Sequence, residues 1–445
     1  MPRNLCQRGC DGVSISDVLT MGYHFGQARW RWQRLNAERL PAFQATKARQ
    51  LIAWVAQHSA FYRQHWQGHD LNDWRNLPAV DKGLMMANFR EFNTLQVPTA
   101  AAFDLAQQAE QQRDFVPRLG NLTVGLSSGT SGHRGLFLVS AAEQLLWAGT
   151  ILGRTLHQIK PTKIAFFLRA NSNLYQQLGG RLIQFRYFDL TQALAGHIQV
   201  LNDYRPTIIV APPALLLQLL AAAQNGQLTH RPERIISVAD ALASDEQQQL
   251  SNYFGIPIEQ IYQATEGLLG ISCAHGNLHL QEDIVAVDFE DLGQGRVTPY
   301  ITDLWRRTQP IIRYRLNDVL RLSAQPCRCG SAFAVIEQIE GRRDDLCYFT
   351  CHGQRQAIFP DSLRRAILLA HSAIQEYQIT QTHDDQLTIT LMLATAADTA
   401  TVGAAVEQQI KLHLADYGCT NCQLSIGFAP IEYGLVNKRR RVIRQ

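Results

Sequence analysis

The stretch Leu122-Thr-Val-Gly-Leu-Ser-Ser-Gly-Thr-Ser-Gly-His-Arg-Gly135 is the most informative part of this sequence. An apolar, strand-like run leads into six residues, Ser127 to Gly132, that hold two glycines and four hydroxyls. Small residues let the backbone bend so that several N–H groups face one point, and the hydroxyls add further donors. The segment therefore predicts a loop that holds a polyphosphate. It is not the common P-loop, because no Gly-Lys-Ser/Thr closes it.

Two other interpretations of the same segment stay open. Gly125-Leu-Ser127-Ser-Gly129 fits the Gly-x-Ser-x-Gly nucleophile elbow of serine hydrolases, with Ser127 as the nucleophile. That motif needs a sharp turn from a strand into a helix, whereas Leu136-Phe-Leu-Val139 reads as a second strand. A glycine-rich loop between two strands favours phosphate binding over the hydrolase. A plain polar surface turn is the remaining alternative.

The bulk composition describes an ordinary soluble globular protein, with 46% hydrophobic and 18% charged residues. A chain of 445 residues exceeds one hydrophobic core, so two or more domains are expected. The net charge of +4 is small and no basic stripe runs through the chain, so nucleic-acid binding is not indicated. The longest apolar stretch, Ile208 to Ala223, is broken by Pro212-Pro213 and predicts a strand and a helix, not a membrane span.

The N-terminus and the cysteines bear on the cellular compartment. The first residues lack the apolar region of a signal peptide, and the cysteine count of 9 is odd. Both observations point to a reducing cytoplasm. Cys419-Thr-Asn-Cys422 has a redox or metal spacing, but the sequence offers it no paired partner.

The order of apolar patterns predicts several regions. The first 115 or so residues look helical, as in Ala42 to His58. Between Gly120 and Pro257, strand-like runs alternate with amphipathic segments, which predicts a parallel, helix-covered sheet. Ligands of such sheets gather beyond the carboxyl ends of the strands. Closely spaced strands follow from Asp283 to Leu322, and a boundary is expected near Gly341-Arg-Arg-Asp-Asp345. The remainder predicts a small α+β domain.

Several segments resemble the adenylate-forming superfamily of acyl-CoA synthetases, luciferases and peptide-synthetase adenylation domains. Within it, the chain is most similar to the phenylacetate-CoA ligase branch and its deazaflavin-coenzyme adenylating relatives. Besides the loop, the segments that carry the resemblance are Phe61-Tyr-Arg63, Leu77-Pro-Ala-Val-Asp-Lys82, Tyr262-Gln-Ala-Thr-Glu-Gly267, Thr302-Asp-Leu304, Pro310-Ile-Ile-Arg-Tyr-Arg-Leu-Asn-Asp318, Gly341-Arg-Arg-Asp-Asp345 and Gly434-Leu-Val-Asn-Lys438.

The resemblance implies an α/β fold with two domains. A large N-terminal AMP-binding domain with helix-covered sheets would span residues 1–343, with its helical region at about 1–115 and its α/β core at about 116–343. A small C-terminal α+β domain would span 344–445. The hinge between them would lie near Asp344. A homodimer stays open, because oligomeric state is not readable from this sequence.

The resemblance also implies an enzyme. It would use ATP and Mg²⁺ to adenylate a carboxylic acid, an aryl acid by first expectation, and then transfer the acyl group to the thiol of CoA or of a carrier protein. Negative charge gathers around one phosphorus in such a reaction, so catalysis is mostly positioning and charge stabilisation. Two alternatives stay open. One is an adenylyltransferase that retains AMP on a coenzyme-like acid, and the other is a nucleotide-binding protein with weak turnover.

The matched motifs assign roles to single residues by resemblance. Glu266 would hold Mg²⁺ beside Thr265, Asp318 would accept two hydrogen bonds from the ribose diol, and Lys438 would place its charge on the acyl-phosphate oxygens. A plain turn aspartate and a basic tail are the other interpretations of the last two. The remaining nucleotide contacts would be Ser127, Ser128, Gly129, Thr130, Ser131, Gly132, Arg134, Asp240, Tyr262, Gln263 and Arg342.

The acid pocket is expected around Tyr204 to Pro213, Ser237 to Leu242 and Tyr262 to Leu269, where small residues leave room for a ring or a chain. Three positions depart from the family's pattern. Arg134-Gly135 stands where the phosphate loop often ends in Pro-Lys. Asn317 and Asn437 replace the glycines before the ribose-binding aspartate and the catalytic lysine. Asn tolerates the same positive φ as glycine, so adenylation remains compatible with these changes.

Cys273-Ala-His275 and Cys327-Arg-Cys329-Gly330 form two pairs of soft metal ligands. Residues i and i+2 of an extended segment point to the same face, so each pair can offer two ligands to one ion. Four such ligands would make a closed, structural zinc site. Some members of the phenylacetate-ligase branch carry similar pairs that bind zinc. The alternative is a set of thiols and imidazoles without a metal.

Overall fold

The computed structural model describes residues 14–112, 118–126, 135–156, 158, 160–168, 183–190, 192–394, 397–431 and 440–445. The predicted phosphate-loop residues Ser127 to Arg134 lie outside these described residues, as do Asn437 and Lys438. Among the described helices, none is long and apolar enough to cross a membrane.

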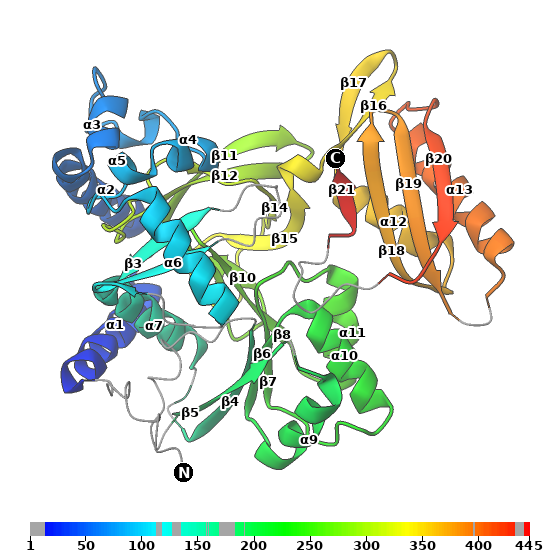
Figure 1. Ribbon diagram of the computed structural model, residues 1–445, viewed down its shortest axis with the longest axis horizontal. Helices are drawn as coiled ribbons and strands as arrows, with labels where there is room; N and C mark the ends of the chain where they lie inside the picture. The colour runs from blue at the N-terminus through cyan, green and yellow to red at the C-terminus, as the bar shows by residue number, and fades with distance from the viewer. Residues whose placement is uncertain are drawn as a thin grey trace, which may run out of the picture.

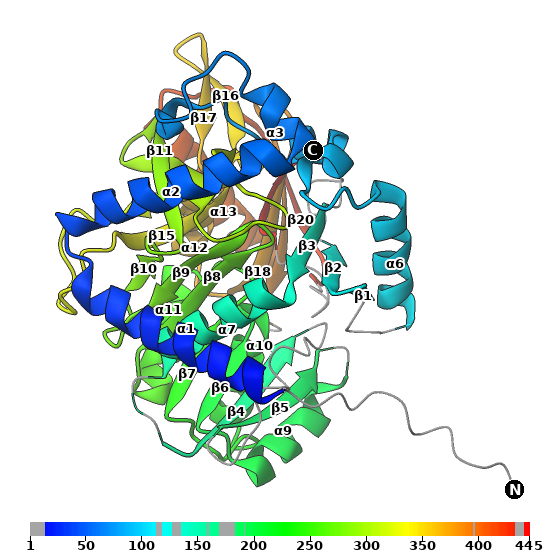
Figure 2. The ribbon, with the colours of Figure 1, turned by 90° about the vertical axis from the view of Figure 1, so that its left-hand side faces the viewer.

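Helices make up most of the N-terminal part of the chain. They are α1 (Ile15–Arg34), α2 (Arg39–His58), α3 (Ala60–His65), α4 (Lys82–Ala87), α5 (Phe89–Phe92) and α6 (Thr99–Gln112), with a 3-10 turn at Trp74–Asn76. Figure 2 shows α1 and α2 running across one side of the main sheet. Ser14 and Asp17 close a capping box that fixes the start of α1.

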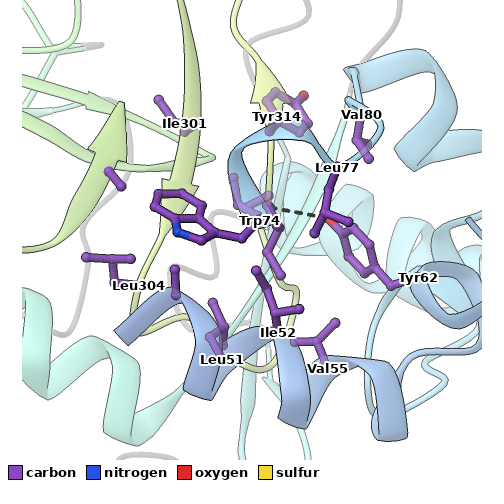
Figure 3. Close-up of a cluster of buried hydrophobic side chains, with 14 of the residues drawn as sticks. Leu51, Ile52, Val55, Tyr62, Trp74, Leu77, Val80, Ile301, Leu304 and Tyr314 are labelled. Atoms are coloured by element: carbon purple, nitrogen blue, oxygen red, sulfur yellow. Dashed lines mark hydrogen bonds between the residues drawn. The ribbon is translucent and has the colours of Figure 1, made fainter. Parts of the chain in front are cut away.

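A hydrophobic cluster joins these helices to the strands that carry part of the candidate site. Leu51, Ile52 and Val55 of α2 point at Trp74, Leu77 and Tyr62, and Ile301 and Leu304 close the cluster from the sheet (Figure 3). Burying side chains of this size contributes about 1.5–3 kcal/mol each. Tyr314 belongs to the same cluster and is 2% exposed, so its position is set by the core.

A separate antiparallel sheet holds the strands on either side of the predicted phosphate loop. Its strands are β1 (Arg118–Leu119), β2 (Leu122–Leu126) and β3 (Leu136–Ser140), in that order. Helix α7 (Ala141–Thr155) begins only after β3, with Ser140 and Glu143 as its capping box. A nucleophile elbow needs a helix directly after the loop, so the serine-hydrolase alternative does not fit this connection.

The main sheet has 12 strands in the order β11-β12-β14-β15-β10-β9-β8-β7-β6-β4-β5, with β13 beside β12. Its parallel part comprises β4 (Thr162–Leu168), β5 (Ile183–Asp189), β6 (Ile208–Ala211), β7 (Arg234–Ser237) and β8 (Ile258–Ala264). The connecting helices are α9 (Leu194–Tyr204), α10 (Pro213–Gln224) and α11 (Ser244–Phe254). The predicted parallel, helix-covered sheet is therefore confirmed for this region.

The other half of the main sheet is antiparallel. It comprises β9 (Gly267–Ser272), β10 (Leu278–Leu280), β11 (Val285–Gly293), β12 (Arg296–Asp303), β13 (Tyr314–Arg315), β14 (Asp318–Leu322) and β15 (Val335–Arg342). The direction of the strands changes between β8 and β9, where Thr265 and Glu266 form the turn. The candidate site lies at this change of direction.

The C-terminal part carries its own sheet and its own buried core (Figure 1). After a 3-10 turn (Arg343–Asp345) come the hairpin β16 (Cys347–Cys351) and β17 (Gln354–Ile358), α12 (Pro360–Ala370), β18 (Ile374–His383), β19 (Gln386–Leu393), α13 (Thr399–Ala415), β20 (Gln423–Phe428) and β21 (Val442–Arg444). The sheet order is β20-β19-β18-β21.

The cysteines of the C-terminal part pair differently from the sequence spacing. Cys351 and Cys419 form a disulfide that ties β16 to the segment after α13. Cys419 thus pairs with Cys351, and Cys422 is a free thiol. The local Cys419-Thr-Asn-Cys422 spacing does not predict this disulfide, because Cys351 and Cys419 lie 68 residues apart in the sequence.

Candidate active site

A cavity of about 1180 Å³ lies at the carboxyl ends of the parallel strands and reaches the C-terminal sheet. It gathers every predicted nucleotide or magnesium residue that the structure describes: Asp240, Tyr262, Gln263, Thr265, Glu266, Asp318 and Arg342. Their sequence positions are far apart, so the fold itself brings them together. The position agrees with the rule that ligands of α/β sheets bind beyond the strand ends.

The carboxylate of Glu266 is held from both sides. Thr265 Oγ1 donates a hydrogen bond of 2.8 Å to Glu266 Oε2, and Tyr314 Oη donates one of 3.1 Å to Oε1. Burial raises the pKa of Tyr314 well above its usual value, and the nearby charge of Glu266 adds to this effect. Tyr314 therefore remains a donor, and Glu266 presents an oriented carboxylate to the cavity. Carboxylate oxygens of this kind suit Mg²⁺.

The predicted ribose ligand Asp318 is also anchored. Tyr262 donates its hydroxyl proton to Asp318 Oδ2, and burial together with this contact raises the pKa of Tyr262 well above its usual value. Asp318 opens β14 and lies opposite Arg342 of β15. An oriented carboxylate next to an arginine can accept hydrogen bonds from a diol.

Several polar contacts connect the cavity to the C-terminal part. Asn317 donates its side-chain amide to Asp344, and its backbone carbonyl accepts a bond of 2.7 Å from the Arg343 N–H. Arg440 pairs with Asp345. Asn317, which stands in place of a family glycine, thus holds the residue predicted as the hinge.

One arginine bridges helix α11 and the C-terminal sheet. Arg441 lies 2.9 Å from a carboxylate oxygen of Glu246 on α11 and 2.7 Å from one of Glu376 on β18. Its side chain is 10% exposed. This cation therefore joins the main sheet's helical layer to the C-terminal sheet at the edge of the cavity.

Lys82 is a cavity residue to which the sequence assigned no role. It begins α4, directly after the cap Asp81, and a parallel bridge between Val80 and Tyr314 brings this segment to the site. Burial lowers the pKa of Lys82, while the carboxylates of Glu266 and Asp344 oppose that shift. Its ammonium thus lies in the field of the magnesium-binding candidate. The sequence feature that could have pointed to Lys82 is its place in the Leu77–Lys82 segment, which resembles the family.

The inner wall of the cavity is apolar. All three predicted acid-pocket segments contribute, through residues such as Val210, Val238 and Ala264. Trp147 of α7 and Phe166 of β4 also line it, and sequence reasoning did not find them. They belong to elements whose pattern alone predicts only a buried face. The cavity therefore combines a charged mouth with an apolar interior.

A second cluster lies at the other end of β9. The ligand atoms of Cys273, His279, Cys327 and Cys329 all lie within 4.8 Å of one another. Cys273 Sγ is 3.7 Å from Cys327 Sγ, and Cys329 Sγ is 3.4 Å from His279 Nε2. His279 Nδ1 contacts the Phe333 carbonyl oxygen at 2.9 Å, which turns Nε2 toward the thiols. Three thiols and one anchored imidazole make a set of four ligands that fits a tetrahedral zinc ion.

This cluster corrects one predicted ligand. His275 was expected beside Cys273, but it is exposed in the turn between β9 and β10, whereas His279 is fully buried in the cluster. Residues two apart in the sequence point to the same face only where the segment is extended. The chain reverses directly after Cys273, so the ligand comes from the returning strand.

Comparison with solved structures identifies the class of fold. The chain superposes on the crystal structure of 2-hydroxyisobutyryl-CoA ligase in its postadenylation state with a TM-score of 0.70, over 93% of this chain and 91% of that chain, at 18% identity. The thioesterification state of the same protein gives 0.58. The fold is thus that of an adenylate-forming enzyme, a large α/β part with a smaller C-terminal part.

Sequence relatives agree with the fold, although no model of a known protein family matches the chain. A phenylacetate-coenzyme A ligase from Thermus thermophilus is 23% identical over 78% of this chain and 79% of its own length. A fumarate–(S)-2,3-diaminopropanoate ligase from Enterobacter agglomerans is 34% identical, over 35% of this chain and 41% of its own length. These relatives and the fold support the adenylate-forming superfamily that the motifs predicted.

Proposed function

We propose that this protein is an ATP-dependent acid–thiol ligase. It converts a carboxylic acid to an acyl-adenylate and then transfers the acyl group to the thiol of CoA, with release of AMP. The observation that carries this proposal is the convergence of Glu266, Asp318, Arg342 and Lys82 on one cavity with an apolar interior. The names of the CoA ligases among its relatives and structural neighbours support it.

The residues divide the work of adenylation among them. Asp318 binds the ribose hydroxyls, and Glu266 holds Mg²⁺, which neutralises phosphate charge when bound. Lys82 lies where it contributes positive charge near the phosphates. Lys438 lies outside the described residues, and the role that its motif suggests is to bind the oxygens on which charge develops. Donors of this kind act because they are already oriented when that charge appears.

The apolar interior selects the acid. Trp147, Phe166 and Val210 offer aromatic and aliphatic surface and carry no charge, which favours an aryl or other apolar carboxylic acid over a polar one. Phenylacetate in the name of the Thermus relative belongs to this class. We further propose that Cys273, His279, Cys327 and Cys329 hold a structural zinc ion, apart from the chemistry.

The deciding experiment is ATP–[³²P]pyrophosphate exchange with a panel of aryl, aliphatic and dicarboxylic acids. The native chain is compared with Lys438→Ala and with Arg439→Ala, which removes a positive charge from the next position. Exchange that depends on the acid, is lost in Lys438→Ala and persists in Arg439→Ala supports the proposal. Equal loss in both variants would support a general basic tail instead.

Two further outcomes separate the alternatives. Exchange followed by release of free AMP only when CoA is added supports the thioester step. Stable AMP on the product in the presence of CoA would indicate an adenylyltransferase. ATP binding without exchange for any acid would indicate a nucleotide-binding protein and contradict the proposal.

A further inference from the structure

Among the residues that the structure describes, strand β3 has one edge that no strand covers. It pairs with β2 alone, through residues such as Val124 and Leu138, so its opposite backbone groups need other partners. Leu136 and Leu138 are buried, and a buried backbone group without a partner costs free energy. Because β3 is the strand that follows the predicted phosphate loop in the sequence, whatever holds this edge also sets the position at which the described chain resumes after it.

Two side chains take the place of a neighbouring strand. Gln309 accepts a bond of 2.8 Å from the Leu138 N–H and donates one of 3.2 Å to the Leu136 carbonyl. Arg306 donates through Nη2 to the Leu138 carbonyl and to Gln309 Oε1, both at 3.2 Å. Arg306 and Gln309 are each 1% exposed, so these are buried, directional contacts.

The same guanidinium reaches the magnesium-binding candidate. Arg306 Nη1 donates a hydrogen bond of 2.6 Å to the carbonyl of Thr265, the residue that also donates to Glu266. One planar group therefore spans from the edge of β3 to the turn between β8 and β9. A lysine has a single ammonium at this place and lacks the fixed fork that serves separate acceptors.

The segment that carries Arg306 is itself fixed from both sides. Asp303 Oδ1 accepts the backbone N–H groups of Trp305 and Arg306 at 3.0 and 3.1 Å. Glu143 Oε1 accepts those of Arg307 and Thr308 at 2.7 and 2.9 Å, while its Oε2 caps α7 through Ser140 at 2.8 Å. The arginine is thus a rigid link between β3, α7 and the Thr265 turn.

We propose that Arg306 is a positioning residue for the nucleotide step, holding β3 and the Thr265–Glu266 turn at the separation that Mg·ATP requires. The inference rests on the proposed function of the cavity. Arg306 does not line the cavity among the described residues, so it acts through Thr265 and Leu138 and not by touching the substrate.

The test compares Arg306→Met and Arg306→Lys with Arg154→Met. Arg154 is also a buried arginine, 7% exposed, but it pairs with Asp283 at 2.9 Å and does not line the cavity. The expected result is a rise of about tenfold or more in KM for ATP and in the Mg²⁺ concentration for half-maximal exchange in Arg306→Met, because bonds to a charged group are lost. In the same variant, KM for the acid should change less than about threefold. Arg306→Lys should recover part of the loss. Arg154→Met should lower Tm, and any change in its KM for ATP should be matched by its KM for the acid.

Two results would overturn the proposal. One is an unchanged KM for ATP in folded Arg306→Met. The other is a KM for ATP and a KM for the acid that change by the same factor, as expected for the Arg154→Met control. If Arg306→Met does not fold, Arg306→Lys and Gln309→Leu replace it, with the same split of KM values expected. If the native chain shows no exchange with any acid, the proposed function fails separately. Calorimetric Mg·ATP affinity then decides: about tenfold weaker binding in Arg306→Met supports the positioning role, and equal affinity, or no binding by the native chain, overturns it.

Discussion

The two ends of strand β9 carry opposite kinds of candidate metal ligands. Glu266 stands just before the strand and Cys273 just after it, roughly 20 Å apart along an extended chain. At the first end, a carboxylate is held by two hydroxyls and faces a cavity. At the second end, three thiols and an imidazole face one another. All residues of the strand between them are buried.

The difference teaches how one strand can serve both catalysis and stability. An oxygen ligand with open positions suits Mg²⁺ and its phosphate substrates, whereas a closed set of sulfur and nitrogen ligands suits a structural zinc ion. Changes at the first end should therefore affect turnover, and changes at the second end should affect folding. Four predictions test this separation.

The largest effect is expected at Glu266. Glu266→Gln keeps the size of the side chain and removes the charge that Mg²⁺ needs, so the rate of pyrophosphate exchange should fall by about 10²–10³. Tm should stay within a few degrees of the native value, since the group faces a cavity. Exchange rates and thermal unfolding of the same preparation measure both. A large drop in Tm with normal exchange would reverse the assignment of this end.

The next effect is expected at Asp318. Asp318→Asn removes a charged acceptor for the ribose hydroxyls, and such bonds contribute about 1.5–3 kcal/mol, so KM for ATP should rise by about 10- to 100-fold. Competition by deoxy-nucleotides is the sharper measurement. Native enzyme should discriminate against 2′-deoxy-ATP, and the variant should lose most of that preference. A variant that discriminates as strongly as the native chain would exclude the ribose role.

A smaller effect on activity, with a clear effect on stability, is expected at the sulfur end. The purified protein should contain about one zinc per chain by elemental analysis. Cys329→Ser should lose the metal and lower Tm by several degrees, because metal binding contributes to folding free energy. kcat of the remaining folded protein should change less than about threefold. Zinc-free native protein, or a loss of exchange that exceeds the loss of folded protein, would contradict the structural role.

The smallest effect concerns Asp303, which is fully buried beside Gly267. Burial raises the pKa of Asp303 to about 6. The folded state therefore holds a proton that the unfolded state has lost between about pH 4 and 6, so this group's stabilisation falls as the pH rises through that window. Asp303→Asn should reduce the stability difference between pH 5 and pH 7 by about 1–2 kcal/mol. Denaturant unfolding at both pH values measures it, and identical pH profiles would exclude the shift.

Short motifs pointed to the Glu266 end of β9, and the structure brings their described residues to one cavity. Glu266 and Asp318 each lie in a run whose residue types the chemistry requires, so the sequence sufficed to propose them as site residues. Lys82 and Arg306 were not assigned roles, because the roles proposed for them depend on contacts with residues far away in the chain. No local pattern distinguishes Arg306 from the neighbouring Arg307.

The sulfur end shows where spacing rules fail. Cys273, Cys327 and Cys329 were found, but the fourth ligand depends on where the chain reverses, and that placed His279 in the cluster instead of His275. The sequence predicted those parts of the fold in which the hydrophobic pattern of strands and helices repeats along the chain. The parallel strands β4 to β8 repeat in this way, whereas the Cys351–Cys419 pair joins elements that only tertiary packing brings together.

If the proposed hinge at Asp344 rotates, the shared position of Arg441 makes ionic strength a variable of the proposed reaction. One guanidinium serves Glu246 of the main sheet's helical layer and Glu376 of the C-terminal sheet. A rotation of the C-terminal sheet about Asp344 would carry Arg441 with Glu376 and separate it from Glu246. Mobile ions stabilise separated charges in water far more than they weaken a buried pair. Added salt should therefore favour the rotated arrangement, and the two half-reactions should respond to it in opposite directions.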